Sequence, residues 1–123
     1  MPDRYKKDVG QLGEDAANAY LRKKRYRIIN RNYYMRGGEL DIIAEKRGVT
    51  VFIEVKTRTS DEYGAPAEAV TYRKMERMKK AAAFYMMQKG LCYARFDIIE
   101  VYADFDGKKF KTEKINHIEN AFV

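Results

Sequence analysis

Two short apolar segments separated by a tight loop constrain the fold of this chain more than any other feature. Residues 39–45 and 50–57 alternate between apolar and polar side chains. This alternation is typical of β-strands, and the short connection predicts a hairpin. If the strands pair at the base of the loop, Asp41 lies directly opposite Glu54 and shares a face of the sheet with it. The other face then collects only apolar side chains, which supports this register: Leu40, Ile42, Ala44, Val51, Ile53 and Val55.

The polar face of this hairpin carries the chemistry. It holds three carboxylates and a lysine, with two apolar residues beside them: Glu39, Asp41, Glu54, Lys56, Ile43 and Phe52. Facing carboxylates repel one another, and burial beneath a helix adds to that cost. A divalent cation relieves it, and oxygen ligands suit Mg²⁺ or Mn²⁺. The pattern therefore indicates a metal site formed by Asp41 and Glu54, with the backbone carbonyl of Val55 as a further ligand.

Lys56 follows Glu54 by two residues and therefore points to the same side of the strand. Beside a metal ion its ammonium can orient or deprotonate a water molecule, or stabilise charge on a phosphate. The alternative interpretation is an exposed charged hairpin, in which Glu54 and Lys56 only increase solubility and neutralise each other. The spacing of these residues does not by itself decide between the two interpretations.

Helical patterns flank this hairpin. We expect helices at residues 9–24 and 66–89, a loop at 58–65, and further strands at 26–35, 95–102 and 108–112. Asp8 is expected to cap the first helix, Pro66 fits the first turn of the second, and Gly90 fits the position just past its end. The Met-rich stripe of the second helix is expected to pack in the core. The order αβββαβ predicts one α/β domain over residues 1–123, whose mixed central sheet is flanked by helices.

Glu14 lies on the predicted first helix, at the edge of its apolar stripe. In the second turn of a helix, a carboxylate gains little from the helix dipole. It can therefore supply a third metal ligand, or it can be an ordinary solvated glutamate.

The chain carries a net charge of +7, and the excess is clustered. Seven basic residues and no acidic one occur between residues 21 and 36, with tyrosines among them, and a second basic cluster lies at residues 73–80. Such clusters suit a phosphate backbone, although a solvated helix end and an exposed edge strand look similar. The residues that we expect to contact nucleic acid are Arg22, Lys23, Lys24, Arg36, Arg58 and Lys74.

The single cysteine, Cys92, excludes an intramolecular disulfide and is expected to be a small buried hydrophobe. The single histidine, His117, stands in no recognisable motif. No apolar run approaches the ~18–20 residues of a membrane span, and the N-terminus lacks the apolar region of a secretory signal. A cytoplasmic protein without membrane contact is the expectation.

Several of these segments together resemble the YraN family of small bacterial proteins. The resemblance rests on Gly13-Glu14, Asn32-Tyr33, residues 38–44, residues 51–58, residues 64–70 with Lys74, and Arg95-Phe96-Asp97. It covers roughly residues 10–101. It implies a restriction-endonuclease-like fold, similar to that of the archaeal Holliday-junction resolvases. Glu14, Asp41, Glu54 and Lys56 match the acidic and lysine positions of the PD-(D/E)xK nucleases.

This resemblance implies an endonuclease that uses Mg²⁺ or Mn²⁺ to hydrolyse phosphodiester bonds in DNA, with branched DNA or junctions as candidate substrates. Fold alone does not establish chemistry. A nucleic-acid-binding module that keeps the fold without catalysis is the alternative, and a protein-interaction subunit of a DNA-processing complex is a weaker one. Symmetric cutting of two strands would favour a homodimer.

Overall fold

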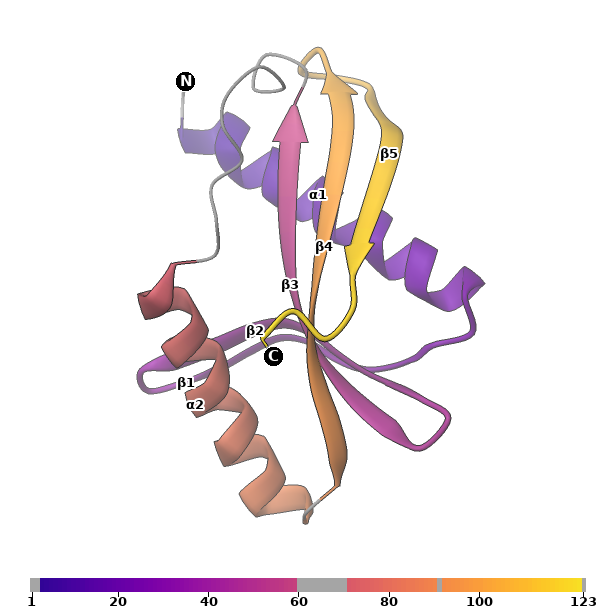
Figure 1. Ribbon diagram of the computed structural model, residues 1–123. Coiled ribbons are helices and arrows are strands. Elements are labelled where there is room, and N and C mark those ends of the chain that lie inside the picture. The colour runs from indigo at the N-terminus through magenta and orange to yellow at the C-terminus, as the bar shows by residue number, and fades with distance from the viewer. Residues whose placement is uncertain (1–2, 60–70, 91, 123) are drawn as a thin grey trace.

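The chain forms a mixed α/β structure built on one five-stranded sheet. The computed structural model describes residues 3–59, 71–90 and 92–122 (Figure 1). The elements in chain order are α1 (Asp3–Lys23), β1 (Arg27–Met35), β2 (Gly38–Lys46), β3 (Val49–Thr59), α2 (Tyr72–Lys89), β4 (Tyr93–Phe105) and β5 (Phe110–Ile118). The strands lie in the order β1-β2-β3-β4-β5. Only β3 and β4 are parallel, and α2 forms the crossover between them. The expected α/β class with a mixed sheet is confirmed.

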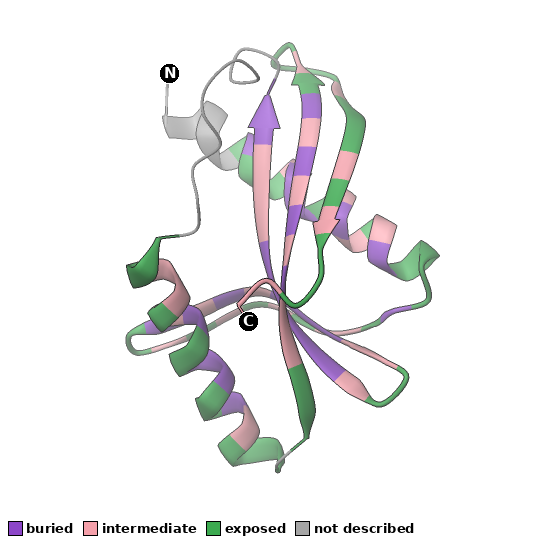
Figure 2. Cartoon of the chain, viewed as in Figure 1, coloured by how far each residue is buried: buried purple, intermediate pink, exposed green. Residues whose placement is uncertain are grey.

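The two helices cover opposite faces of the sheet. Ala17 and Leu21 of α1 pack against Ile42 and Ile53 in one apolar cluster. Helix α2 contributes to the second cluster, whose buried members are Leu40, Ile43, Phe52, Met78, Ala81, Ala82 and Tyr85. Residues adjacent in a strand point to opposite faces, so each strand contributes to both clusters. Along β4, buried residues alternate with half-buried ones (Figure 2). The predicted core role of the Met-rich stripe on α2 is confirmed.

The predicted register of the β2–β3 hairpin is correct where the two strands pair. Glu45 opposes Thr50, and the pairing continues as far as Ile42 opposite Ile53. It ends there, so Asp41 and Glu54 are not a ladder pair. Leu40 was expected on the α1 face but packs in the α2 cluster. The reason is that β2 beyond Ile42 no longer lies beside β3, so the alternation of the paired region does not extend to it.

The ends of several elements differ from the prediction. Helix α1 begins at Asp3, so Asp8 lies inside it and does not cap it. Helix α2 begins at Tyr72 because Thr71, in an extended conformation, caps it by accepting a hydrogen bond from the Lys74 backbone N–H at 3.1 Å. The predicted start at Pro66 lies outside the described residues.

Four of the five strands are longer than expected, and β1 is one residue shorter. β3 extends to Thr59 and includes Arg58, which was expected in a loop. The β3–β4 ladder continues to Thr59 opposite Ala103, so backbone pairing overrides the weak local pattern. β4 and β5 also extend past their expected ends, because they pair with each other from Ile98–Ile118 to Phe105–Phe110.

Cys92 was expected to be buried and is exposed. It precedes β4, where the chain has left α2 and has not yet entered the sheet, so it lies outside the packed core. None of the described helices is long and apolar enough to span a bilayer.

Candidate metal and nucleic-acid site

Asp41 and Glu54 lie where β2 and β3 diverge. Asp41 Oδ2 accepts a hydrogen bond from the Val55 backbone N–H at 2.8 Å. The backbone ladder between β2 and β3 ends at Ile42–Ile53, and just beyond this point the Asp41 side chain accepts the β3 N–H in place of a β2 carbonyl. In Figure 1, β1 and β2 cross away from the upper halves of β3 and β4. The divergence brings the Asp41 carboxylate against β3, beside Glu54.

Glu54 is a buried carboxylate whose charge is poorly compensated. The residue is 6% exposed, and its Oε2 atom has no hydrogen-bond partner within the described part of the chain. Burial, together with the negative charge of Asp41, raises the pKa of Glu54 to about 8. Burial also raises the pKa of Asp41, although the Val55 N–H opposes that rise. At neutral pH the pair therefore holds a proton or needs a cation.

A lysine from α2 supplies part of the missing positive charge. Lys74 Nζ lies 2.5 Å from Glu39 Oε1 and 3.4 Å from Glu54 Oε1. Arg77 Nε also reaches Glu39 Oε1, at 3.7 Å. The hydrogen bond from Lys74 lowers the pKa of Glu39 despite its partial burial. The sequence placed Lys74 among the nucleic-acid contacts, and nothing in the local pattern reveals that its ammonium binds two carboxylates.

Glu14 is buried at 7% exposure and faces β1. Its Oε1 atom accepts hydrogen bonds from Arg31 Nε at 3.0 Å and from Asn32 Nδ2 at 3.1 Å. Burial raises the pKa of Glu14, the Arg31 guanidinium opposes this rise, and the charge of Asp41 adds to it. Among the residues that the structure describes, no three side chains of the acidic, histidine or cysteine types converge closely enough to hold a metal ion. Glu14 therefore neighbours the Asp41–Glu54 pair without joining it.

Lys56 and Arg58 follow Glu54 along β3. Lys56 is half-buried, and it forms no ion pair or hydrogen bond with any described residue. Arg58 is buried, with its Nε atom 3.8 Å from Glu100 Oε2 on β4. The unpaired ammonium of Lys56 contrasts with that of Lys74, which two carboxylates hold.

The residues predicted to contact nucleic acid do not form one surface. Arg22, Lys23 and Lys24 are exposed at the C-terminal end of α1, and Arg36 is exposed in the β1–β2 turn. Figure 1 shows the end of α1 and the start of α2, which carries Lys74, on opposite sides of the sheet. The basic cluster of α1 is therefore remote from the start of α2.

A second polar cluster, which the sequence did not reveal, centres on Asp97 of β4. Asp97 is fully buried and accepts hydrogen bonds from Arg95 Nε at 3.0 Å and from the Asn120 backbone N–H at 3.0 Å, while His117 Nε2 lies 2.7 Å from it. Although burial opposes this, the hydrogen bonds lower the pKa of Asp97. His117 Nδ1 lies 3.0 Å from the hydroxyl of Tyr20 on α1. The cluster thus joins β4, β5, the segment after β5 and α1, and it gives the single histidine a structural role.

Comparison with known proteins identifies the family. The model described as "Uncharacterised protein family UPF0102" matches residues 13–101. The chain belongs to the UPF0102 family. A UPF0102 protein of Syntrophomonas wolfei is 46% identical over 118 residues, which cover 94% of this chain and 98% of that protein. UPF0102 proteins of Caldanaerobacter subterraneus (45% identical; 95% of this chain and 96% of that protein) and Trichlorobacter lovleyi (48%; 93% and 89%) are also similar.

This membership confirms the resemblance to the YraN family, which is the UPF0102 family. The matched residues include Glu14, Asp41, Glu54 and Lys56, and they extend from α1 into β4. Strand β5 and two partners of Asp97, His117 and Asn120, lie beyond the matched segment of this UPF0102 protein.

Proposed function

We propose that this protein is a divalent-metal-dependent endonuclease that hydrolyses phosphodiester bonds in DNA. One observation carries the proposal: Glu54 keeps a buried oxygen without a hydrogen-bond partner among the described residues, beside a second desolvated carboxylate. A buried carboxylate without compensation is costly, and a bound cation removes that cost. Carboxylate oxygens are the ligands that Mg²⁺ and Mn²⁺ prefer.

The residues present fit such an ion. Asp41 and Glu54 would hold it, with the backbone carbonyl of Val55 as the third protein ligand. Asp41 Oδ2 is engaged by the Val55 N–H, which fixes the carboxylate and leaves its second oxygen for an ion. Glu14 can join these ligands only if its carboxylate leaves Arg31 and Asn32.

When bound, the metal ion would polarise a phosphoryl oxygen and lower the pKa of a water molecule. Lys56 would hold the attacking water or a negative phosphate oxygen, because its ammonium is bound by no described residue. Lys74 would keep Glu39 and part of Glu54 neutralised, so that the remaining negative charge lies on the two ligands. Arg31 would hold Glu14 away from the phosphate that approaches.

Calorimetric titration with Mn²⁺ is the first test. We expect binding to the wild type and loss of binding in the Asp41→Asn/Glu54→Gln double variant. Glu45→Gln is the matched control, because Glu45 is on the same strand as Asp41, is partly exposed and pairs with Arg27; this variant should bind Mn²⁺ normally. Absence of binding to the wild type, with and without DNA, would contradict the metal site.

Cleavage is the second test, on supercoiled, branched and single-stranded DNA with Mg²⁺ or Mn²⁺. Asp41→Asn should abolish cleavage and leave DNA binding largely intact. Lys56→Ala should reduce cleavage by about 10²-fold or more, as is typical when a group that stabilises developing charge is removed. Normal turnover by Lys56→Ala would remove this lysine from the mechanism.

A nucleic-acid-binding module without catalysis is the second candidate, and one observation favours it. Arg31 and Asn32 hold the Glu14 carboxylate, and the described residues contain no cluster of three metal-binding side chains. Such a module would bind DNA with a steep salt dependence and show no metal-dependent turnover on any substrate. Normal DNA binding together with absent Mn²⁺ binding would identify it.

A further inference from the structure

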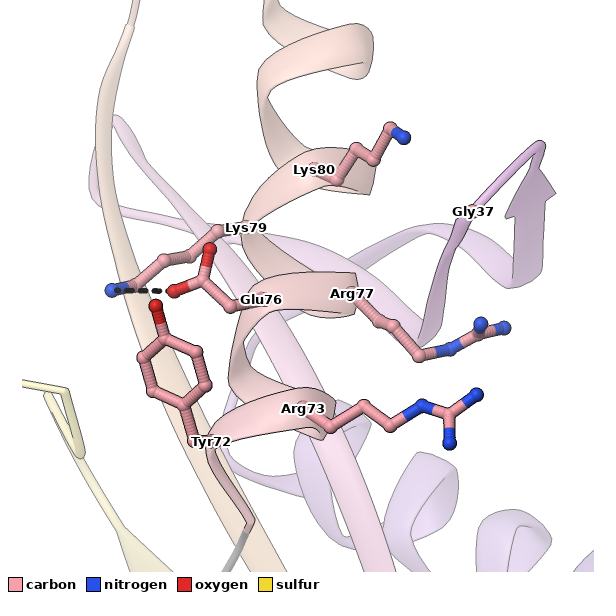
Figure 3. A pocket seen from close by; sticks show the side chains of 7 residues that line it. All are labelled: Gly37, Tyr72, Arg73, Glu76, Arg77, Lys79 and Lys80. Atoms are coloured by element: carbon pink, nitrogen blue, oxygen red, sulfur yellow. Dashed lines mark ion pairs between the residues drawn. The ribbon is translucent and has the colours of Figure 1, made fainter.

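A basic groove runs along the N-terminal half of α2, where this helix faces the β1–β2 turn. The groove has a volume of about 630 Å³, and four cationic side chains line it against one carboxylate, that of Glu76 (Figure 3). The cationic residues are Arg73, Arg77, Lys79 and Lys80. Glu76 lies 4.0 Å from Lys79, so this pair is largely neutral by itself. The net positive charge of the groove therefore comes from the other three cations.

These three cations form one stripe. Arg73, Arg77 and Lys80 are separated by four and three residues, which places them on one side of a helix. Figure 3 shows all three pointing away from the Glu76–Lys79 pair and toward the side where Gly37 lies. Each residue of a helix adds about 1.5 Å of rise, so neighbouring cations are roughly 4.5–6 Å apart along the axis, comparable with successive phosphates of a strand.

The stripe is poorly compensated by the protein itself. Within the described residues neither Arg73 nor Lys80 has a carboxylate partner, and Lys80 instead extends over Gly37. Glu76 stands three positions after Arg73 and four before Lys80, but its carboxylate lies beside Lys79 and forms an ion pair with neither of those two cations. Here like charges lie one turn apart, an arrangement that a polyanion stabilises.

The groove leads directly to the acidic pair. Arg77 lines it and reaches Glu39 Oε1 at 3.7 Å, and the same oxygen binds Lys74. Lys74 in turn lies 3.4 Å from Glu54. A DNA strand whose phosphates contact the stripe is therefore separated from Glu54 only by the ion pairs that Glu39 forms with Arg77 and Lys74. The basic cluster at the end of α1 has no such connection, because it lies across the sheet from α2 (Figure 1).

We propose that this groove binds the sugar–phosphate backbone of a DNA strand, with its phosphates on Arg73, Arg77 and Lys80, and that it directs the strand toward Asp41 and Glu54. The second part rests on the proposed nuclease function, whereas the first part concerns binding alone. The surface that holds the strand beside the acidic pair is thus the start of α2, not the basic end of α1.

The test is DNA binding by fluorescence anisotropy in buffer without divalent cations, so that cleavage plays no part. Labelled single-stranded and duplex oligonucleotides are titrated over a range of salt concentrations. The test variant is Arg73→Gln/Lys80→Gln, which spares Arg77 and its contact with Glu39. The matched control is Lys108→Gln/Lys109→Gln, which removes the same charge from two exposed lysines in the β4–β5 turn. Urea denaturation establishes that both variants fold.

Losing two phosphate contacts should lower the slope of log K against log salt by about 1.4 for single strands and about 1.8 for duplex. We expect the test variant to bind at least about 10-fold more weakly near 0.1 M salt, and the control to change by less than about threefold. Equal slopes for the two variants, or no binding of DNA by the wild type, would overturn the groove. A selective loss in the test variant would support the groove even if the wild type cleaves no substrate. Normal cleavage by the test variant, with unchanged binding, would leave the nuclease standing and refute the groove.

Discussion

The pKa of Glu54 leads to a prediction about stability that needs no substrate. In Glu54→Gln an amide replaces a carboxyl group that the fold keeps protonated, so the variant should be more stable than the wild type at neutral and alkaline pH. The cause is the burial of Glu54 beside Asp41, which raises the pKa of Glu54 to about 8 from the ordinary 4.5. A group whose pKa rises on folding contributes stability that is complete below pH 4.5 and is lost as the pH rises through about 8.

The magnitude follows from the two pKa values. The difference between about 8 and 4.5 corresponds to roughly 5 kcal/mol at most, reached above pH 8. At pH 7 the wild type should have lost roughly 3 kcal/mol, and at pH 5 less than about 1 kcal/mol. A typical domain has about 5–15 kcal/mol in total, so the loss is large. Other groups also titrate, but the difference between the wild type and Glu54→Gln isolates this carboxyl group.

The assay is urea denaturation at pH 5, 7 and 9 of the wild type, Glu54→Gln and the partly exposed control Glu45→Gln. We expect the wild type and Glu54→Gln to converge at pH 5 and to separate progressively toward pH 9. Glu45→Gln should follow the wild type within about 1 kcal/mol, because its ion pair with Arg27 is exposed. A difference that stays constant with pH would refute the reasoning, and with it the argument that the Asp41–Glu54 pair needs a cation.

Mn²⁺ provides a further arm of the same experiment at pH 7. A ligand that binds only the folded state stabilises it by about 2.7 kcal/mol at 100 times its Kd. The wild type and Glu45→Gln should gain this stability, and Glu54→Gln should gain little. The ion must displace the proton of Glu54, so Mn²⁺ affinity should increase as the pH rises toward 8.

Three further predictions concern packing and caps. Gly13→Ala should lower the free energy of unfolding by about 1–3 kcal/mol, because the added methyl group would overlap the side chain of Thr57. Gly10→Ala in the same helix should raise it by about 0.5–1 kcal/mol, because the methyl group there meets nothing within 4 Å. Equal denaturation midpoints for these two variants would contradict the close approach of α1 to β3. Asp97→Asn should lower the free energy of unfolding by about 3 kcal/mol at pH 7, because it disrupts a buried hydrogen-bonded charge. Since folding lowers the pKa of Asp97, the wild type should lose this stability below about pH 4. Acid titration of both proteins measures this loss. Thr71→Ala should cost about 1 kcal/mol in urea by removing the N-cap of α2, and an unchanged midpoint would show that the cap contributes nothing.

Local patterns were sufficient to predict the hairpin. The apolar alternation and the short loop determine which residues of β2 and β3 face each other, and the structure pairs them accordingly from Lys46–Val49 to Ile42–Ile53. The end of the ladder was not predictable in this way. It depends on the Asp41 side chain accepting the Val55 N–H, and no periodicity encodes that choice.

Helix ends and ion pairs were harder to predict for related reasons. Asp8 and Pro66 both suit the start of a helix, but α1 begins earlier, at Asp3, and Thr71 provides the cap of α2. Lys74 meets Glu39 across 35 residues of sequence, and this contact exists only because α2 packs over the hairpin. From charge alone, Lys74 is one basic residue of a cluster and is predicted to lie on the surface.

The distribution of charge around Lys74 explains why an ion would bind at Asp41 and Glu54 and not at Glu39. Glu39 receives the shorter contact with Lys74 and a second one from Arg77, and its pKa is lowered accordingly. Burial raises the pKa values of Glu54 and Asp41; among the described residues, Glu54 receives only the longer contact with Lys74 and Asp41 forms no ion pair, so little opposes this rise. Three carboxylates therefore share two basic groups unequally, and the deficit of positive charge falls on the two carboxylates that burial desolvates most. A divalent ion gains most from binding where that deficit lies, next to the groove that we propose for the phosphates.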